Sequence, residues 1–210
     1  WIAGIVGSAD LTDPQLEHVL EEFALEKKFV GVRHLCHEEK DGRWSVREDV
    51  VRSLKLLAKH DLTYDLVWTP KHLSLMPQLA PKVPDLKLVI DHLAKPRIAD
   101  GFNANQQWQH DLAAAAKCPN VYCKLSGMTT EAGDKWTPDD LKPFVQFTID
   151  CFGFDRVMYG SDWPVCTLAA TYQQQLDALK AALEPISDSD YEKVFRTTAA
   201  KFYNIHTQGV

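Results

Sequence analysis

The stretch RVMYGSDWPVC carries a carboxylate at the end of a short apolar run. Asp162 follows Met158 and Gly160 in the same two-residue phase, so we expect its side chain to point to the interior side of a strand. An ionised carboxylate in such a place is costly unless it has a partner or a chemical task. Trp163 adds a rigid apolar wall of the kind that substrate pockets use. Asp162 is therefore the strongest candidate for a catalytic group, and a loop-bracing or helix-capping carboxylate is the alternative.

A second ionisable pair ends the apolar run in VIDHLAKP, where Asp91 and His92 are followed by Lys95. Side chains alternate along a strand, so Asp91 and His92 are expected on opposite faces. We predict that His92 points inward and that Asp91 points outward to a backbone or helix contact. The alternative for His92 is a hydrogen-bonded core histidine with no chemical role.

A third group occurs in FVGVRHLCH, where Arg33 and His34 lie at a strand end and His37 follows in the loop. A guanidinium binds two carboxylate oxygens at once, so Arg33 would suit a substrate carboxylate. The alternative is an ion pair between Arg33 and a neighbouring acid such as Asp65. His34 and His37 are three residues apart and would not share a strand face, so they make a weak zinc pair.

Short apolar segments rich in β-branched residues are the elements that would position these groups. Six of them are predicted as strands, at residues 1–11, 29–35, 62–68, 86–94, 120–127 and 156–162. The segments between them carry apolar residues at helical spacing, as Leu16, Val19, Leu20 and Phe23 do. Three helix starts match the capping-box pattern: Ser45 with Glu48, Thr137 with Asp140, and Ser189 with Glu192.

Alternating strands and helices predict βαβ units and a parallel sheet. A doubly wound sheet would carry a glycine-rich phosphate loop after its first strand, and this sequence has none. A (β/α)8 barrel carries its polar residues at the carboxyl ends of its strands. The residues that fit this pattern are Arg33, His34, Asp65, Asp91, His92, Lys124, Ser126 and Asp162. We therefore predict an α/β fold of the (β/α)8 TIM-barrel type.

The number of units is smaller than a whole barrel requires. About six βα units are visible in the 210 residues, whereas a barrel has eight in about 250 residues. The first two units are therefore expected to be missing, which agrees with a chain that opens on Trp1 within a strand-like segment. We predict one barrel domain, residues 1–210, that is incomplete at its N-terminal side.

Composition excludes several classes of function. Hydrophobic residues make up 45% and charged residues 25%, as in ordinary globular proteins, and the net charge of −6 argues against nucleic acid as a partner. No apolar run reaches the roughly 18 residues of a membrane span, and no signal peptide opens the chain. The five cysteines show no CxxC spacing and are predicted to be reduced thiols of a cytoplasmic protein. A small-molecule substrate is expected, and the oligomeric state stays open.

Five motifs together resemble one family. GVRHL, LVIDHLAKP, NVYCKLSGM, VMYGSDWPV and AAKFYNI occur in the family's order and cover nearly the whole chain. They are similar to the amidohydrolase superfamily, in the branch that contains fuconolactonase-like sugar-lactone lactonases and pyrone-dicarboxylate lactonase. The resemblance implies that VRH lies on the fourth strand of the barrel, DH on the sixth and GSD on the eighth.

The sequence departs from the pattern of the superfamily in one respect, which concerns metal binding. Members of the superfamily begin with an HxH pair on the first strand, and no HxH occurs in this sequence. That pair supplies metal ligands in many members, whereas some lactonases of this branch work without a metal. A divalent metal such as zinc is therefore left open, with His92 and Asp162 as its candidate ligands.

The resemblance also implies roles for the candidate residues in opening a sugar-acid or related carboxylated lactone. Asp162 would be the general base for water, and His92 would donate to the carbonyl oxygen or help to hold a metal. Arg33, with Lys95, would hold a carboxylate or sugar hydroxyls. Three residues are further candidate substrate contacts: His34, Lys124 and Trp163. Lys124 facing only solvent is the alternative for that residue.

Two other functions are kept as alternatives. One is a metal-dependent decarboxylase of the same superfamily, and the other is a non-catalytic barrel that has lost its first strands. All the enzyme hypotheses require Arg33, His92 and Asp162 to converge on one cavity at the carboxyl ends of the strands.

Overall fold

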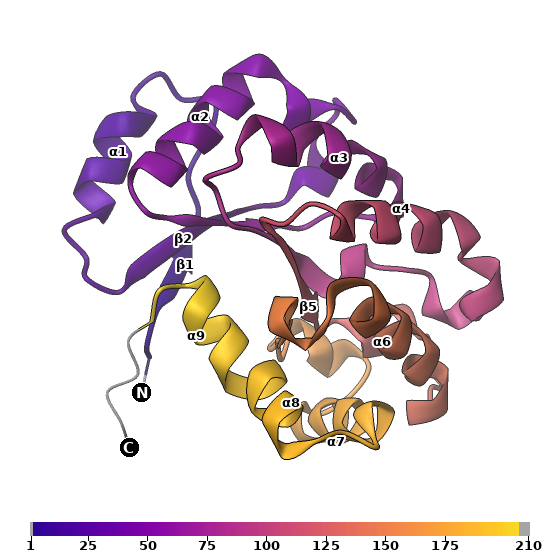
Figure 1. Cartoon of the computed structure of the whole chain (residues 1–210). Coiled ribbons are helices and arrows are strands. Elements are labelled where there is room, and N and C mark those ends of the chain that lie inside the picture. Colours follow the sequence, from indigo (N-terminus) through magenta and orange to yellow (C-terminus); the bar gives the residue numbers. More distant parts are fainter. Residues whose placement is uncertain (1, 206–210) are drawn as a thin grey trace.

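A computed structural model describes residues 2–205 of the chain and contains a six-stranded sheet. Neighbouring strands are parallel and follow one another in sequence order, which excludes a doubly wound sheet. The strands are β1 (Ile5–Gly7), β2 (Phe29–His34), β3 (Thr63–Leu66), β4 (Leu88–Ile90), β5 (Val121–Leu125) and β6 (Val157–Tyr159). Each of the six predicted segments therefore contains a strand. The sheet curls into a half-barrel, as in a partial TIM-type fold (Figure 1).

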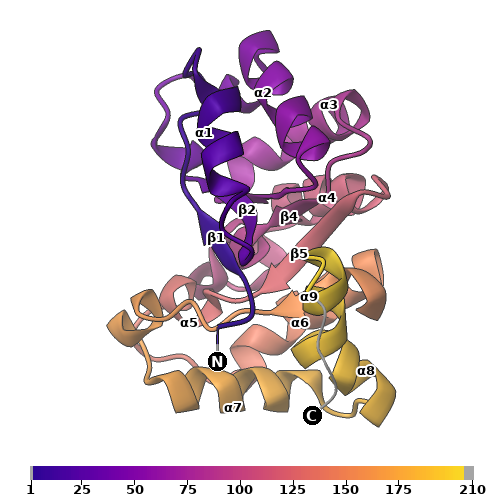
Figure 2. The same cartoon turned by 90° about the vertical axis from the view of Figure 1, so that its left-hand side faces the viewer.

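Helices follow the strands along the chain and pack mainly on the convex side of the sheet (Figures 1 and 2). They are α1 (Leu16–Phe23), α2 (Glu48–Lys59), α3 (Met76–Leu79), α4 (Gln106–Ala116), α5 (Met128–Glu131), α6 (Pro138–Phe152), α7 (Tyr172–Leu183), α8 (Asp188–Glu192) and α9 (Thr198–Phe202). A π-helical turn, Lys193–Thr197, joins α8 to α9. Among residues 2–205, none of the helices has the length and apolar character that a membrane crossing requires.

Alternation along the strands divides apolar residues between two cores. Leu88 and Ile90 of β4 belong to the main core, which lies between the sheet and the helices. Val89, between them, points to the concave face and packs with Met158 and Phe202. This side-chain alternation also places charged residues of β3 and β5 on the concave face, where the cavity described below lies.

The end of α9 covers part of this concave face. Phe202 is fully buried against Val89 and Met158. The ammonium group of Lys87, just before β4, donates hydrogen bonds to the carbonyl oxygens of Lys201 and Phe202, both at 3.0 Å. A cation beside carbonyls at a helix C-terminus is favourable because those groups have no partner within the helix. The helix end is thereby fixed to the amino end of the strand that leads to His92.

One of the three predicted capping boxes is confirmed. Thr137 and Asp140 cap α6 reciprocally. Ser45 does not cap α2, because it is buried and accepts a hydrogen bond from the indole of Trp68.

The third predicted box is displaced by two residues, since Ser187, and not Ser189, caps α8 by accepting from the amide of Asp190. The sequence pattern missed a further box, in which Thr171 and Gln174 cap α7.

Candidate active site

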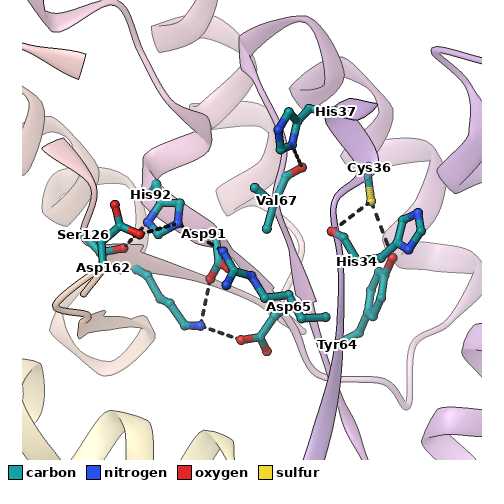
Figure 3. Close-up of polar contacts among 12 residues, drawn as sticks. His34, Cys36, His37, Tyr64, Asp65, Val67, Asp91, His92, Ser126 and Asp162 are labelled. Atoms are coloured by element: carbon teal, nitrogen blue, oxygen red, sulfur yellow. Dashed lines mark hydrogen bonds and ion pairs between the residues drawn. The ribbon is translucent and has the colours of Figure 1, made fainter. Parts of the chain in front are cut away.

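A cavity of about 520 Å³ lies on the concave face of the sheet. Arg33, His92, Asp162 and Trp163 line it at the carboxyl ends of the strands, and Tyr203 lines it from the end of α9. Arg33 comes from β2, whereas His92 and Asp162 come from the segments after β4 and β6. Figure 3 shows His92 and Asp162 pointing toward each other. Three candidate residues from distant parts of the chain therefore meet in one place.

The segment after β4 has an unusual backbone. β4 ends at Ile90, and the four residues from His92 to Lys95 all have φ between 53° and 58°. This left-handed conformation costs about 1–2 kcal/mol for each residue that carries a side chain. The turn brings both Asp91 and His92 into the cavity. The prediction that Asp91 points outward is wrong, because the alternation of a strand does not continue beyond Ile90.

Asp162 has a left-handed backbone as well, with φ of 53°. Its main-chain carbonyl accepts a hydrogen bond from the amide of Cys166 at 2.8 Å, which begins the following turn. Its carboxylate oxygen Oδ1 lies 3.4 Å from Nε2 of His92, and the two side chains are 10% and 9% exposed. An imidazole and a carboxylate thus face each other in a site that is nearly closed to solvent.

Alternating charges extend from this pair along the concave face. Lys124 of β5 bridges Asp65 of β3 at 2.5 Å and Asp91 at 2.8 Å. The second oxygen of Asp91 forms an ion pair with Nε of Arg33 at 2.9 Å, and the hydroxyl of Tyr203 donates to Asp65 at 2.7 Å. Figure 3 shows the two carboxylates of this network, Asp65 and Asp91. Arg33 therefore pairs with Asp91 and not with Asp65, the partner considered from the sequence.

Burial and these ion pairs shift the pKa values of the group. Burial raises the pKa of Asp65, and the nearby Asp91 carboxylate adds to this although Lys124 opposes it. Burial also acts to raise the pKa of Asp91, but Lys124, His92 and Arg33 outweigh it and lower that pKa. For Lys124, burial is outweighed by the two carboxylates, so its pKa lies well above the usual value. Lys124 is therefore charged and fully committed to Asp65 and Asp91.

His92 differs from these charged groups. Burial lowers its pKa below 6.5, although Asp91 and Asp162 act in the opposite direction. Its Nδ1 lies 2.8 Å from the hydroxyl oxygen of Ser126. At neutral pH the ring is therefore uncharged, and one of its nitrogens carries a proton while the other accepts.

The remaining candidates lie in different surroundings. Lys124 lines the cavity, where ion pairs hold its side chain at 18% exposure, so it does not face only solvent. Trp163 is 66% exposed at the cavity mouth. His34 stacks on Trp44, with ring centres 4.2 Å apart, and contacts Glu39 at 2.7 Å, outside the cavity lining.

Lys95 also lies outside the lining of the cavity. His37, the other histidine of the FVGVRHLCH segment, contacts the carbonyl oxygen of Val67 through Nδ1 at 3.3 Å.

Two residues next to His92 were not predicted as site residues. Ser126 is 1% exposed and contacts the ring, and Gly127 follows it with φ of 61°. A Cβ atom at Gly127 would lie 2.8 Å from the His92 ring, so only glycine leaves room for the imidazole. The sequence did offer one indication of Ser126: side-chain alternation along β5, continued by one residue, places it on the same face as Lys124.

Zinc is the metal that the resemblance raises, and the geometry around His92 provides a test. Two zinc ligands at tetrahedral angles lie about 3.4 Å apart, which matches the separation of His92 Nε2 and Asp162 Oδ1. A catalytic zinc needs three protein ligands, and residues 2–205 contain no group of three or more suitable side chains. The guanidinium of Arg33 also lies 3.4 Å from the same nitrogen and would repel a cation. The described residues therefore do not make up a zinc site.

Comparisons with known proteins agree with this geometry. An L-fucono-1,5-lactonase from Burkholderia ambifaria is 37% identical over 174 residues, which are 82% of this chain and 59% of that relative. Another, from Burkholderia multivorans, is 34% identical over 96% of this chain and 71% of its own length. The crystal structure of a B. multivorans amidohydrolase with bound zinc gives a TM-score of 0.90 at 32% identity, covering 97% of this chain and 74% of that one.

The match to a family model is equally extensive. The model described as Amidohydrolase matches residues 2–205, which is the entire described part of the chain. With relatives above 30% identity and the same parallel sheet, the chain belongs to the amidohydrolase family.

Proposed function

We propose that the protein is a hydrolase that opens a sugar-acid lactone by attack of water on the lactone carbonyl. The observation that carries this proposal is the closely spaced pair of Asp162 and His92 in a cavity of about 520 Å³. The likeness to two L-fucono-1,5-lactonases supports the same class of substrate.

The reaction needs a base, a donor to the carbonyl and support for the developing charge. Asp162 accepts a proton from water as the water oxygen attacks the carbonyl carbon. His92 donates from Nε2 to the carbonyl oxygen, which becomes an oxyanion. The ring carbon–oxygen bond then breaks, and the proton held by Asp162 passes to the leaving oxygen to give the hydroxy acid.

Arg33 and Trp163 are proposed as the substrate contacts. The Arg33 side chain is 42% exposed, so its guanidinium can donate to substrate oxygens while Asp91 holds its Nε. Trp163 offers an apolar surface at the mouth for the face of a sugar ring. Lys124 supports Arg33 through Asp91 and is not proposed as a substrate contact. His34 and Lys95 are also left out, because neither lines the cavity.

The proposal includes a closed barrel around this site. Two further βα units would lie between β6 and β1, which are the two edges of the described sheet. They would cover the concave face. A cytoplasmic location belongs to the same proposal and is supported by five cysteines that are all free.

Two alternatives are less well supported by the same observations. A metal-dependent decarboxylase is less well supported because the relatives of 37% and 34% identity are both L-fucono-1,5-lactonases. A non-catalytic barrel has no need for left-handed backbone at both His92 and Asp162. Strain of this kind is concentrated at functional sites, so it favours an enzyme.

Replacing Asp162 with Asn tests the proposed base. The amide keeps the shape of the side chain but accepts no proton from water, so kcat on the best of a panel of five- and six-membered aldonolactones should fall by about 10²–10⁴-fold. KM and the melting temperature should change little. Asp155→Asn is the matched control, because Asp155 is 76% exposed and lies away from the cavity.

Two results would contradict the proposal. Turnover that survives in Asp162→Asn, or that falls only in step with thermal stability, would leave the carboxylate a structural role. Carbon dioxide release from aromatic carboxylic acids, lost on chelation and without lactone hydrolysis, would instead support the decarboxylase.

A further inference from the structure

We propose that Ser126 is a positioning residue that keeps the proton of His92 on Nε2, the ring nitrogen that faces Asp162. The inference deepens the proposed function, on which its catalytic consequence rests. It concerns the tautomer of a neutral ring, which the hydrogen-bond partners of the two ring nitrogens decide.

The contact on the far side of the ring is short and buried. Ser126 follows the end of β5 and is 1% exposed, and its oxygen lies 2.8 Å from Nδ1 of His92 (Figure 3). The His92 side chain is itself 9% exposed. Water competes poorly for a contact at this depth, so the two groups must satisfy each other.

Counting protons assigns the direction of this bond. Within residues 2–205, the Ser126 hydroxyl has no hydrogen-bond partner other than Nδ1 of His92. If Nδ1 carried the proton, the serine hydroxyl proton would be buried without an acceptor, which costs about 1–3 kcal/mol. If the serine donates instead, both groups are satisfied and Nε2 carries the ring proton.

The groups on the cavity side do not decide the tautomer. Oδ1 of Asp162 lies 3.4 Å from Nε2 and favours a proton there. Nη2 of Arg33 lies 3.4 Å from Nε2 and can only donate, so this hydrogen bond favours an unprotonated Nε2. It is long for a hydrogen bond, whereas the contact with Ser126 is 2.8 Å and buried, so we assign the proton by the Ser126 contact.

Close packing keeps the ring in this arrangement. A Cβ atom at Gly127 would lie 2.8 Å from Nδ1 of His92, and one at Gly160 would lie 3.0 Å from the Cβ of Ser126. The imidazole therefore rests against the backbone of Gly127, and Ser126 is confined by β6. In the proposed reaction, the ring then presents an N–H to the carbonyl oxygen.

Nitrogen NMR of the ¹⁵N-labelled protein tests the tautomer without any substrate. We expect the His92 ring to show an unprotonated Nδ1 and a protonated Nε2 at neutral pH. His92→Asn identifies the signals by their loss, and asparagine tolerates the left-handed backbone at this position. In Ser126→Ala the preference should weaken, with Nδ1 becoming protonated in a measurable fraction of molecules.

The same variant should lose turnover. Alanine is smaller than serine, so it fits beside Gly160 and should fold. We expect kcat to fall on the order of 10²-fold with little change in KM, since the ring then fails to donate in many molecules. Ser53→Ala is the matched control: Ser53 is also buried, but its hydroxyl bonds the carbonyl of Leu11. The control should keep both the His92 spectrum and the turnover.

A protonated Nδ1 in the wild-type protein, or a tautomer that Ser126→Ala leaves unchanged, would overturn the inference. These spectra are independent of catalysis. The expected tautomer in a protein that hydrolyses no lactone would therefore contradict the proposed function and leave the role of Ser126 standing.

Discussion

Lys124 is the residue on which the charges of the concave face depend, since it is the cation between two buried carboxylates. In Lys124→Met, Asp65 and Asp91 would face each other without it, and breaking a buried pair costs about 3–5 kcal/mol. Without the lysine, the pKa values of Asp65 and Asp91 in the folded protein would lie above those of the same residues in the unfolded chain. Stability should therefore fall as pH rises, so urea denaturation at about pH 5 and pH 8 should show the larger loss at pH 8.

Two variants control this experiment. Adding Asp65→Asn to Lys124→Met should recover part of the stability, because within residues 2–205 Asp65 then has no cationic partner, whereas Asp91 still has Arg33. Lys117→Met changes an exposed lysine and should have little effect. A loss below about 1 kcal/mol in Lys124→Met at both pH values would show that the ion pairs contribute little to stability.

At the scale of elements, the turn after β4 stores strain in four left-handed residues. Of these four residues, Lys95 is the most suitable to replace, because its side chain is half-buried whereas the other three are buried. Lys95→Gly removes the steric cost of a side chain at φ of 54° but increases the entropy of the unfolded chain. The net effect should be a gain of about 0.5–1 kcal/mol in the free energy of unfolding.

A lysine in ordinary right-handed backbone provides the comparison. Lys117, at the end of α4, has φ of −70°, and Lys117→Gly should lose about 0.5–1 kcal/mol. Equal losses in the two glycine variants, measured by chemical denaturation, would show that the turn holds no strain at Lys95.

Strands and their order could be predicted from the sequence, whereas this turn could not. The alternation of Leu88, Val89 and Ile90 follows from residue types, and so does the parallel order of six βα units. A left-handed turn is normally signalled by glycine, and DHLAK has none. Its conformation depends on contacts with distant segments, such as the His92 ring against Gly127. For that reason the inward direction of Asp91 was outside what local patterns predict, whereas alternation did place Ser126 on the same face as Lys124.

At the scale of the whole molecule, the two sheet edges test the proposed closed barrel. The amide of Gly160 donates to Leu125, so the amide of Tyr159 points away from β5, in keeping with strand alternation. If a further strand pairs with β6, the Tyr159 amide should exchange with deuterium about as slowly as that of Gly160. Residue-resolved exchange by NMR measures both. Fast exchange at Tyr159 beside slow exchange at Gly160 would mean that β6 is an open edge.

The contact between α9 and the concave face also has a consequence for biosynthesis. Val89 leaves the ribosome long before Phe202, the residue that covers it. Among residues 2–205, the segments made before β4 do not cover this apolar inner surface. Helices on the convex side can dock as they emerge, but this inner layer must wait for α9. The interval between translation of β4 and translation of α9 is therefore when the chain most needs protection from aggregation.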